Sequence, residues 1–291
     1  MTISDNMSGS LGRAADPGPV LRRLSPAIGI EVLGIDLAQP VADSTLRKIQ
    51  GAWEENCVVL LRGQQINLIK QLRFAKRFGA VAKSTRGPPP VLEVGNAPDS
   101  NGMLGILPDG PVDFHSDQCY VAEPPIATLL YAVDVPQHGG NTLFANGFLA
   151  YESLPGEMKR RLAGRQALHI YDYETNPVRR PLQPPAGAKQ AAHPIFRIHA
   201  PTGRMALYVN RLMTWSIVDM EPEESRRTLD FLFSHQENPG FVYEHIWQRG
   251  DLVMWDNRSC IHARTDFDAG ERRRLQRITV LDGGHVLDGG H

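Results

Sequence analysis

The sequence predicts a mainly β protein with flanking helices, and three observations lead to that fold class. Short runs rich in β-branched and aromatic residues recur along the chain, whereas amphipathic helical stretches are few. Strands and helices do not alternate regularly, which argues against a parallel doubly wound sheet. The chain of 291 residues is long enough for one such domain with a full core. A double-sheet jelly roll fits the number of expected strands.

Two helices and several strands are expected in the first third of the chain. Residues 28–37 are expected to form one or two short strands, and residues 44–55 repeat apolar side chains near the helical period. The apolar run at residues 57–61 is too short for a helix and predicts a buried strand. A second amphipathic helix is expected over residues 68–78, with Gly79 placed to end it in a left-handed conformation.

The middle of the chain is expected to contain strands and one stretch rich in proline and glycine. Residues 84–113 form that stretch, with a strand at residues 91–94. Such a stretch in a compact domain is more often functional than idle. A long buried strand is predicted at residues 126–135, and the glycine pair at 139–140 turns the chain into a strand at residues 142–145.

The last part of the chain is expected to combine helices, a surface excursion and strands. Residues 158–162 look helical, and residues 171–192, with four prolines, predict a surface excursion or lid. A hairpin is predicted at residues 195–210, and the apolar spacing at residues 223–235 predicts a helix. Three further strands are expected at residues 242–247, 251–255 and 274–281.

Composition and charge exclude several classes of partner. The net charge of −1 gives no global field that would recruit nucleic acid or an anionic membrane. No apolar run approaches the roughly 20 residues that cross a bilayer. Residues 1–19 lack the basic-then-apolar layout of a secretory signal. We therefore expect a disordered leader at residues 1–19, a single domain over residues 20–283 and a flexible tail at residues 284–291.

The three cysteines, Cys57, Cys119 and Cys260, form no Cys-x-x-Cys pair. This sparse, odd number favours a reducing cytoplasm over a disulfide framework. Each cysteine is interpreted as a small buried hydrophobic residue. Strand alternation places Cys119 on the same face as His115 and Asp117, so its thiol is expected near them.

His115, Asp117 and His262 are the candidate metal ligands. Along a strand, residues i and i+2 point to the same face, so His115 and Asp117 can converge on one ion. His262 follows a strand that reaches a polar turn at residues 255–258, although a hydrogen-bonded surface histidine is the alternative. Two imidazoles and one carboxylate bind ferrous iron and leave positions open for a cosubstrate and oxygen. A His-x-Asp match alone is weak evidence.

Arg273 and Arg277 follow the second histidine and share one face of a predicted strand. A buried arginine needs an anionic partner, and one carboxylate of 2-oxoglutarate could satisfy Arg273 bidentately. Arg277 would need a second anion, either an acidic side chain or the substrate. Ion pairing of both arginines with Asp266, Asp268 or Glu271 is the alternative. With the candidate triad, this pattern predicts a non-haem iron oxygenase that consumes 2-oxoglutarate and molecular oxygen.

The motifs together resemble the taurine dioxygenase and 2,4-dichlorophenoxyacetate dioxygenase (TauD/TfdA) family. The similarity extends over roughly residues 25–283, and the ordered set is specific although each motif alone is weak. The residues that carry it are His115-Ser116-Asp117, Gly139-Gly140-Asn141-Thr142, Trp255-Asp256-Asn257-Arg258, His262, Arg273 and Arg277.

This resemblance implies a double-stranded β-helix core, a homo-oligomer (dimer or larger), and Fe(II), 2-oxoglutarate and molecular oxygen as cofactor and cosubstrates. It implies that Thr142 and Arg273 hold the distal carboxylate of 2-oxoglutarate and that Trp255 lines that pocket. Arg277 matches the arginine that grips a sulfonate or carboxylate of the substrate. Asp117 keeps the third metal ligand, which favours hydroxylation over halogenation.

Departures from the family pattern bear on the substrate. The loop at residues 84–87 lacks the His and Tyr contacts of the taurine enzymes, and Phe114 stands where many relatives have Trp. Residues 250–255 look closer to the aryloxyacetate enzymes. We expect a small anionic substrate, an aryloxyalkanoate-like acid, with an alkylsulfonate or an alkyl sulfate ester as the alternative. Tyr208 and Phe144 are candidate walls of the substrate pocket.

Two other classes of function stay open from the sequence. A metal-dependent hydrolase would use the same triad to activate water, but it has no use for Arg273 together with Thr142. A non-catalytic barrel that senses a small anion would keep the arginines and tolerate loss of His115 or Asp117.

Overall fold

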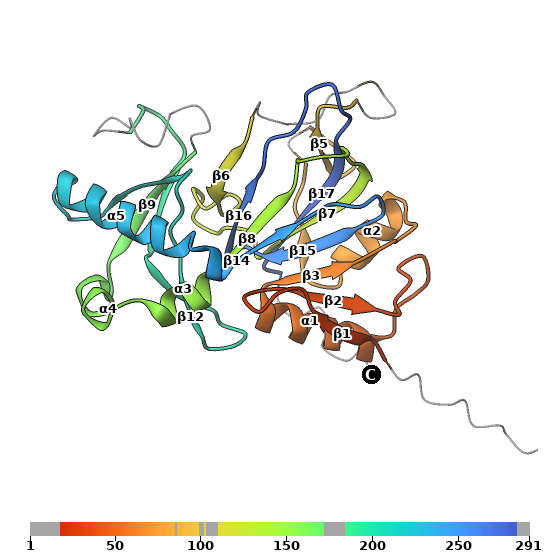
Figure 1. The fold of residues 1–291 in the computed structure, drawn as a ribbon, viewed down its shortest axis with the longest axis horizontal. Helices are drawn as coiled ribbons and strands as arrows, with labels where there is room; N and C mark the ends of the chain where they lie inside the picture. Colours follow the sequence, from red (N-terminus) through yellow and green to blue (C-terminus); the bar gives the residue numbers. More distant parts are fainter. Residues whose placement is uncertain (1–17, 85, 99–101, 103–109, 172–183, 284–291) are drawn as a thin grey trace, which may run out of the picture.

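Two facing β-sheets form the centre of the computed structural model, which describes residues 18–84, 86–98, 102, 110–171 and 184–283 (Figure 1). Neighbouring strands of the larger sheet are antiparallel, except that β2 and β3 are parallel. Its order is β1 (Val20–Arg23), β2 (Ile30–Leu33), β3 (Val58–Leu61), β15 (Leu252–Asp256), β7 (Ala127–Asp134), β17 (Arg274–Leu281) and β4 (Ala80–Val81), with β5 (Leu92–Gly95) also paired to β17.

The smaller sheet has four antiparallel strands and packs on the inner face of the larger one. One core cluster joins Phe144 and Cys260 of the smaller sheet to Leu60, Leu130 and Val253 of the larger sheet. Two sheets around one core confirm the predicted mainly β fold with a jelly-roll centre. The order of the smaller sheet is β14 (Val242–His245), β8 (Thr142–Asn146), β16 (Cys260–Arg264) and β6 (Val112–His115).

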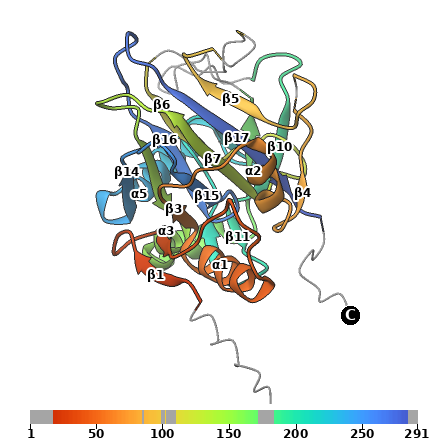
Figure 2. The same ribbon diagram turned by 90° about the vertical axis from the view of Figure 1, so that its right-hand side faces the viewer.

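Two helices cover the outer face of the larger sheet, as Figure 2 shows from the side. Helices α1 (Asp43–Asn56) and α2 (Leu68–Ala75) carry apolar residues at the helical spacing, and these pack on the strands. Ile49 and Trp53 are fully buried in this layer. The helices shield one face of the sheet from water, so the other face is left to form the interior of the sandwich.

The predicted end of the second helix is wrong. The C-cap of α2 is Lys76, three residues before Gly79. The backbone N–H groups of Arg77 and Phe78 donate to carbonyl groups three residues back, so the chain leaves the helix through a tighter turn. A left-handed cap at Gly79 is therefore not needed.

A further group of elements lies beside the two sheets, at the left of Figure 1. It has its own core cluster, which includes Leu162, Leu207 and Leu229. The β11–β12 pair confirms the predicted hairpin, whereas α3, β9 and β13 were not predicted. The group comprises α3 (Gly147–Ser153), α4 (Gly156–Leu162), β9 (Gln166–Ile170), β10 (Gln190–Pro194), β11 (Phe196–Ile198), β12 (Met205–Leu207), β13 (Thr214–Ile217), α5 (Pro222–Gln236) and the 3₁₀ helix η2 (Pro239–Phe241).

Some sequence expectations fall on parts of the chain that are not described. Most of the expected leader, the whole tail and most of the predicted lid at residues 171–192 lie outside the described residues. Strand β1 was not predicted, because all four of its residues are exposed and show no alternation. Within the described ranges, no helix combines the length and the apolar character that spanning a membrane requires.

Gly95 allows β5 to approach the start of β17 closely. It is the register partner of Arg274, and a Cβ atom built on Gly95 would lie 1.8 Å from the carbonyl oxygen of Arg273. Any side chain at this position must therefore push the two strands apart. The position of Arg273 depends on this contact between backbones.

We predict that Gly95→Ala lowers the free energy of unfolding by about 1–3 kcal/mol, because the added methyl group overpacks a strand pair. Gly51→Ala is the matched control, since Gly51 lies in α1 and a Cβ atom there meets nothing within 4 Å. That control should gain about 0.5–1 kcal/mol from helix propensity. Urea denaturation of both variants measures these changes, and equal stabilities would contradict the close approach.

Candidate metal centre and anion cavity

Strand pairing brings the three candidate ligands together. His115 is the last residue of β6 and is the register partner of His262 in β16, so the two imidazoles lie side by side with ring centroids 4.1 Å apart. Asp117 follows two residues after β6. One ligand atom from each of the three residues lies within 4.8 Å of the other two, and all three residues are buried.

The route by which Asp117 reaches this place differs from the expected one. Strand β6 ends at His115, and Asp117 begins a turn in which Gln118 has a φ of 52°. A turn, and not strand alternation, therefore returns the carboxylate toward the histidines. Cys119, which alternation placed near the ligands, does not line the cavity, and its thiol lies 3.6 Å from the sulfur of Met213. Burial raises the pKa of Cys119 to about 12.

The protonation states of the three residues suit a divalent cation. Burial lowers the pKa of both His115 and His262, so their imidazoles are neutral. The Nδ1–H of His115 donates to the carbonyl oxygen of Asp113 at 2.9 Å, which leaves Nε2 for a metal. Burial opposes ionisation of Asp117, but the charge of Arg277, together with the hydrogen bond from Thr128, lowers its pKa to about 2. Two neutral nitrogens and one carboxylate are a ligand set for ferrous iron.

A buried chain of hydrogen bonds fixes the carboxylate of Asp117. The hydroxyl of Thr128 donates to Asp117 Oδ2 at 2.6 Å, and Asn257 Nδ2 donates to Thr128 Oγ1 at 3.0 Å. The indole Nε1–H of Trp255 donates to Asn257 Oδ1 at 2.9 Å. These hydrogen bonds link a candidate metal ligand to Trp255, which also lines the cavity. The sequence does not single out Thr128, because a threonine within a buried strand carries no pattern that distinguishes it from its neighbours.

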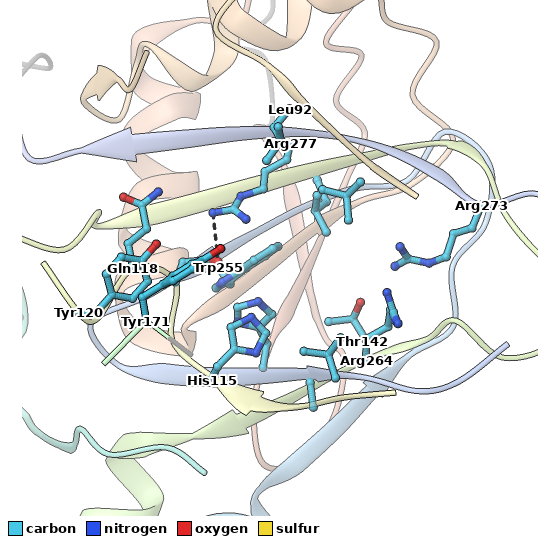
Figure 3. Close-up of a pocket in the computed structure, with 16 residues that line it drawn as sticks. Leu92, His115, Gln118, Tyr120, Thr142, Tyr171, Trp255, Arg264, Arg273 and Arg277 are labelled. Atoms are coloured by element: carbon cyan, nitrogen blue, oxygen red, sulfur yellow. Dashed lines mark ion pairs between the residues drawn. The ribbon is translucent and has the colours of Figure 1, made fainter. Parts of the chain in front are cut away.

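A cavity of about 360 Å³ opens beside the triad, within the range of small-molecule sites. Figure 3 shows Arg273, Thr142 and Arg264 on one side of His115. The aromatic pair of Tyr120 and Tyr171 lies on the other side of His115, and Arg277 lies above His115 in this view. The cavity is lined by Leu92, Val94, Val112, His115, Asp117, Gln118, Tyr120, Leu130, Thr142, Tyr171, Trp255, His262, Ala263, Arg264, Arg273 and Arg277.

Arg273 is a buried cation with no ion pair among the described residues. Only 2% of its surface is exposed; its Nε–H donates to the carbonyl oxygen of Gly140 at 3.2 Å, and its Nη1 has no hydrogen-bond partner there. Burial, and then the charge of Arg264, lower its pKa to about 9. Such a guanidinium is stable only with an anion beside it, so this end of the cavity is shaped for a carboxylate.

Arg277 lies at the other end and has a partner that was not expected. Its Nη2 is 3.1 Å from Oδ1 of Asp117, not beside Asp266, Asp268 or Glu271. Its side chain remains partly exposed to the cavity. It can therefore meet an anion that enters beside the triad.

Two residues expected as pocket walls lie away from the cavity surface. Phe144 is fully buried between the sheets, with its ring 5.5 Å from Trp255 and 6.3 Å from His262. Tyr208 packs against His169 and His193 at centroid distances of 5.7 Å. Neither belongs to the lining residues of the described chain. Phe144 therefore packs against Trp255 and His262 from the interior of the sandwich.

The family model for "Taurine catabolism dioxygenase TauD, TfdA family" matches residues 21–279 of the chain. A pentalenolactone F synthase of Streptomyces avermitilis is 31% identical over 93% of this chain and 95% of its own. An alpha-ketoglutarate-dependent 2,4-dichlorophenoxyacetate dioxygenase of Cupriavidus pinatubonensis is 30% identical over 90% of this chain and 98% of its own. The crystal structure of AAD-2 in complex with Mn(II) and N-oxalylglycine has a TM-score of 0.77 and 28% identity, and covers 91% of this chain and 98% of its own.

We predict that Thr128→Val weakens the binding of a divalent metal about tenfold, because the carboxylate of Asp117 loses the hydrogen bond that orients it. Thr128→Ser keeps the hydroxyl and should stay close to the parent protein. Calorimetric titration with Mn(II) measures both affinities. Equal affinity of the valine variant and the parent would contradict the positioning role of Thr128.

Proposed function

The chain belongs to the taurine catabolism dioxygenase TauD, TfdA family, and we propose that it hydroxylates an aryloxyalkanoate-like carboxylic acid. It is an oxidoreductase that uses Fe(II), 2-oxoglutarate and molecular oxygen. This family membership removes the hydrolase and the non-catalytic barrel from consideration. We propose the identity of the substrate and the role of each residue in the site.

In this proposal, His115, Asp117 and His262 hold the ferrous ion. Thr142 and Arg273 hold the distal carboxylate of 2-oxoglutarate, and Trp255 forms a wall beside it. The buried Nη1 of Arg273 has no hydrogen-bond partner among the described residues, and this supports the assignment because a dicarboxylate would supply an anion there. When bound, the iron and its cosubstrate supply the oxidation: oxygen and 2-oxoglutarate are converted to succinate and carbon dioxide while one oxygen atom enters a C–H bond of the substrate.

The observation that carries the substrate assignment is the combination of Arg277 with aromatic walls. Arg277 faces the cavity at the end where Tyr120 and Tyr171 form an edge-to-face pair, with ring centroids 4.9 Å apart (Figure 3). Leu92 and Leu130 add apolar surface to the cavity. A guanidinium suits a carboxylate, and aromatic and leucine side chains suit an aryl ring.

Arg277 would set the position of the reacting carbon. If it binds the substrate carboxylate, the adjacent carbon lies toward the triad and the ring lies toward the tyrosines. Hydroxylation of the carbon between the ether oxygen and the carboxylate gives a hemiacetal. Its collapse breaks the C–O bond to the aryl group, and the hydroxyl proton ends on the departing phenol, which leaves an oxo acid. Product analysis should therefore find a phenol.

An alkylsulfonate or an alkyl sulfate ester is the second candidate. The family model is named for taurine catabolism, and a guanidinium also binds the oxygens of a sulfonate. The aromatic pair gives such a substrate no specific contact. A panel of aryloxyalkanoates, sulfonates, sulfate esters and the substrate of pentalenolactone F synthase, scored by succinate release, separates these classes.

We also propose a cytoplasmic homo-oligomer. Cys57, Cys119 and Cys260 are buried free thiols, which suits a reducing compartment. The oligomer rests on the family resemblance alone.

We predict that Arg277→Gln raises the KM for an anionic aryloxyalkanoate by about 10- to 100-fold, because a charge-assisted hydrogen bond is lost. The methyl ester of the same acid lacks the anion and should be used equally by both proteins. Succinate release measures both reactions. Because Arg277 also contacts Asp117, Mn(II) affinity is measured in parallel. An unchanged KM for the acid would rule out this anion contact.

A further inference from the structure

Gln118 lines the cavity and has no role in the function proposed above. It directly follows Asp117 in the chain, and its side chain is half-buried. Within the described residues it forms hydrogen bonds through its backbone, where its carbonyl oxygen accepts from the N–H of Val121 at 3.1 Å. Its side-chain amide, which offers two donor hydrogens and one acceptor oxygen, therefore remains available to a molecule in the cavity.

The backbone of Gln118 adopts a conformation that a glutamine disfavours. Its φ of 52° lies in the left-handed region, which glycine and asparagine occupy more readily. The turn that returns Asp117 toward the histidines requires this φ, so a glycine would serve the turn better. Backbone strain of this kind is concentrated in residues that bind ligands or take part in catalysis. The strain therefore indicates that the amide of Gln118 has a function beyond the turn.

The place of Gln118 in the cavity indicates what its amide would contact. In Figure 3 its side chain lies above the pair of Tyr120 and Tyr171, with Arg277 to its right. The proposed function places the substrate carboxylate at Arg277 and the aryl ring at the two tyrosines. The atoms that link the ring to the carboxylate then lie near Gln118. In an aryloxyalkanoate one of these atoms is an ether oxygen, which accepts hydrogen bonds and cannot donate them.

We propose that the side-chain amide of Gln118 donates a hydrogen bond to the ether oxygen of the substrate. By this contact it selects aryl ethers over acids that carry a methylene group in place of the oxygen. The inference rests on the proposed function, because that function sets the two ends of the substrate. The competing explanation is that Gln118 only completes the turn after Asp117. A residue with that role alone would affect ethers and their methylene analogues equally.

Phenoxyacetate and 3-phenylpropanoate separate the two explanations, because they differ only in an ether oxygen against a methylene group. Calorimetric titration of the protein loaded with Mn(II) and 2-oxoglutarate measures both affinities as binding, apart from turnover. In the parent protein we expect phenoxyacetate to bind about 3- to 10-fold more tightly, which is the contribution of one neutral hydrogen bond. Gln118→Met keeps the length and the unbranched shape of the side chain, and it should bind the two acids within about twofold of each other.

Gln118→Gly is a second test, because glycine suits the positive φ and also lacks the amide. It should lose the preference for the ether and keep the affinity of the parent protein for Mn(II). Gln248→Met is the matched control, since it makes the same replacement at an exposed side chain, and it should keep the preference.

Equal binding of the two acids by the parent protein would overturn the proposal, as would a preference that persists in both Gln118 variants. If the parent protein binds neither acid, the proposed substrate class fails, and this inference fails with it. The two failures are therefore distinguishable.

Discussion

The register of β16 between β6 and β8 is the constraint on which the site depends. It sets His262 opposite His115 on one side and opposite Phe144 on the other, and it sets Arg264 opposite Thr142. Side chains alternate across a strand, so a slip of one residue would turn both His262 and Arg264 to the opposite face. The metal ligands and the cationic end of the cavity therefore depend on one hydrogen-bonded ladder.

Burial makes the polar groups of the site depend on one another. The imidazoles of His115 and His262 are neutral because burial lowers their pKa, whereas Asp117 stays ionised because Arg277 helps to lower its pKa. At the other end, Arg273 is buried without an ion pair among the described residues. Buried charges are stable only when they are paired. The cavity is thus matched to a divalent cation at its centre and to anions at both ends.

Local patterns predicted most elements, and the exceptions have physical causes. The apolar run at residues 126–135 predicted the bounds of β7 to within one residue at each end. A long buried strand can be predicted from its own sequence, without knowledge of the strands that pair with it. The position of Asp117 depends on a turn with a positive φ at Gln118, which alternation does not reveal. Thr128 and Arg264 gain their contacts only through strands distant in the sequence. Arg264 could have been found, since it follows His262 at the spacing used for His115 and Asp117.

The central claim is that His115, Asp117 and His262 hold a ferrous ion next to bound 2-oxoglutarate. Anaerobic addition of Fe(II) and 2-oxoglutarate to the protein tests it most directly, by the weak visible absorption that the 2-oxo acid acquires when it chelates iron. We expect this band in the parent protein, saturating at one 2-oxoglutarate per chain, and its loss in Asp117→Ala. No band in the parent protein, or an unchanged band in Asp117→Ala, would contradict the assigned ligands.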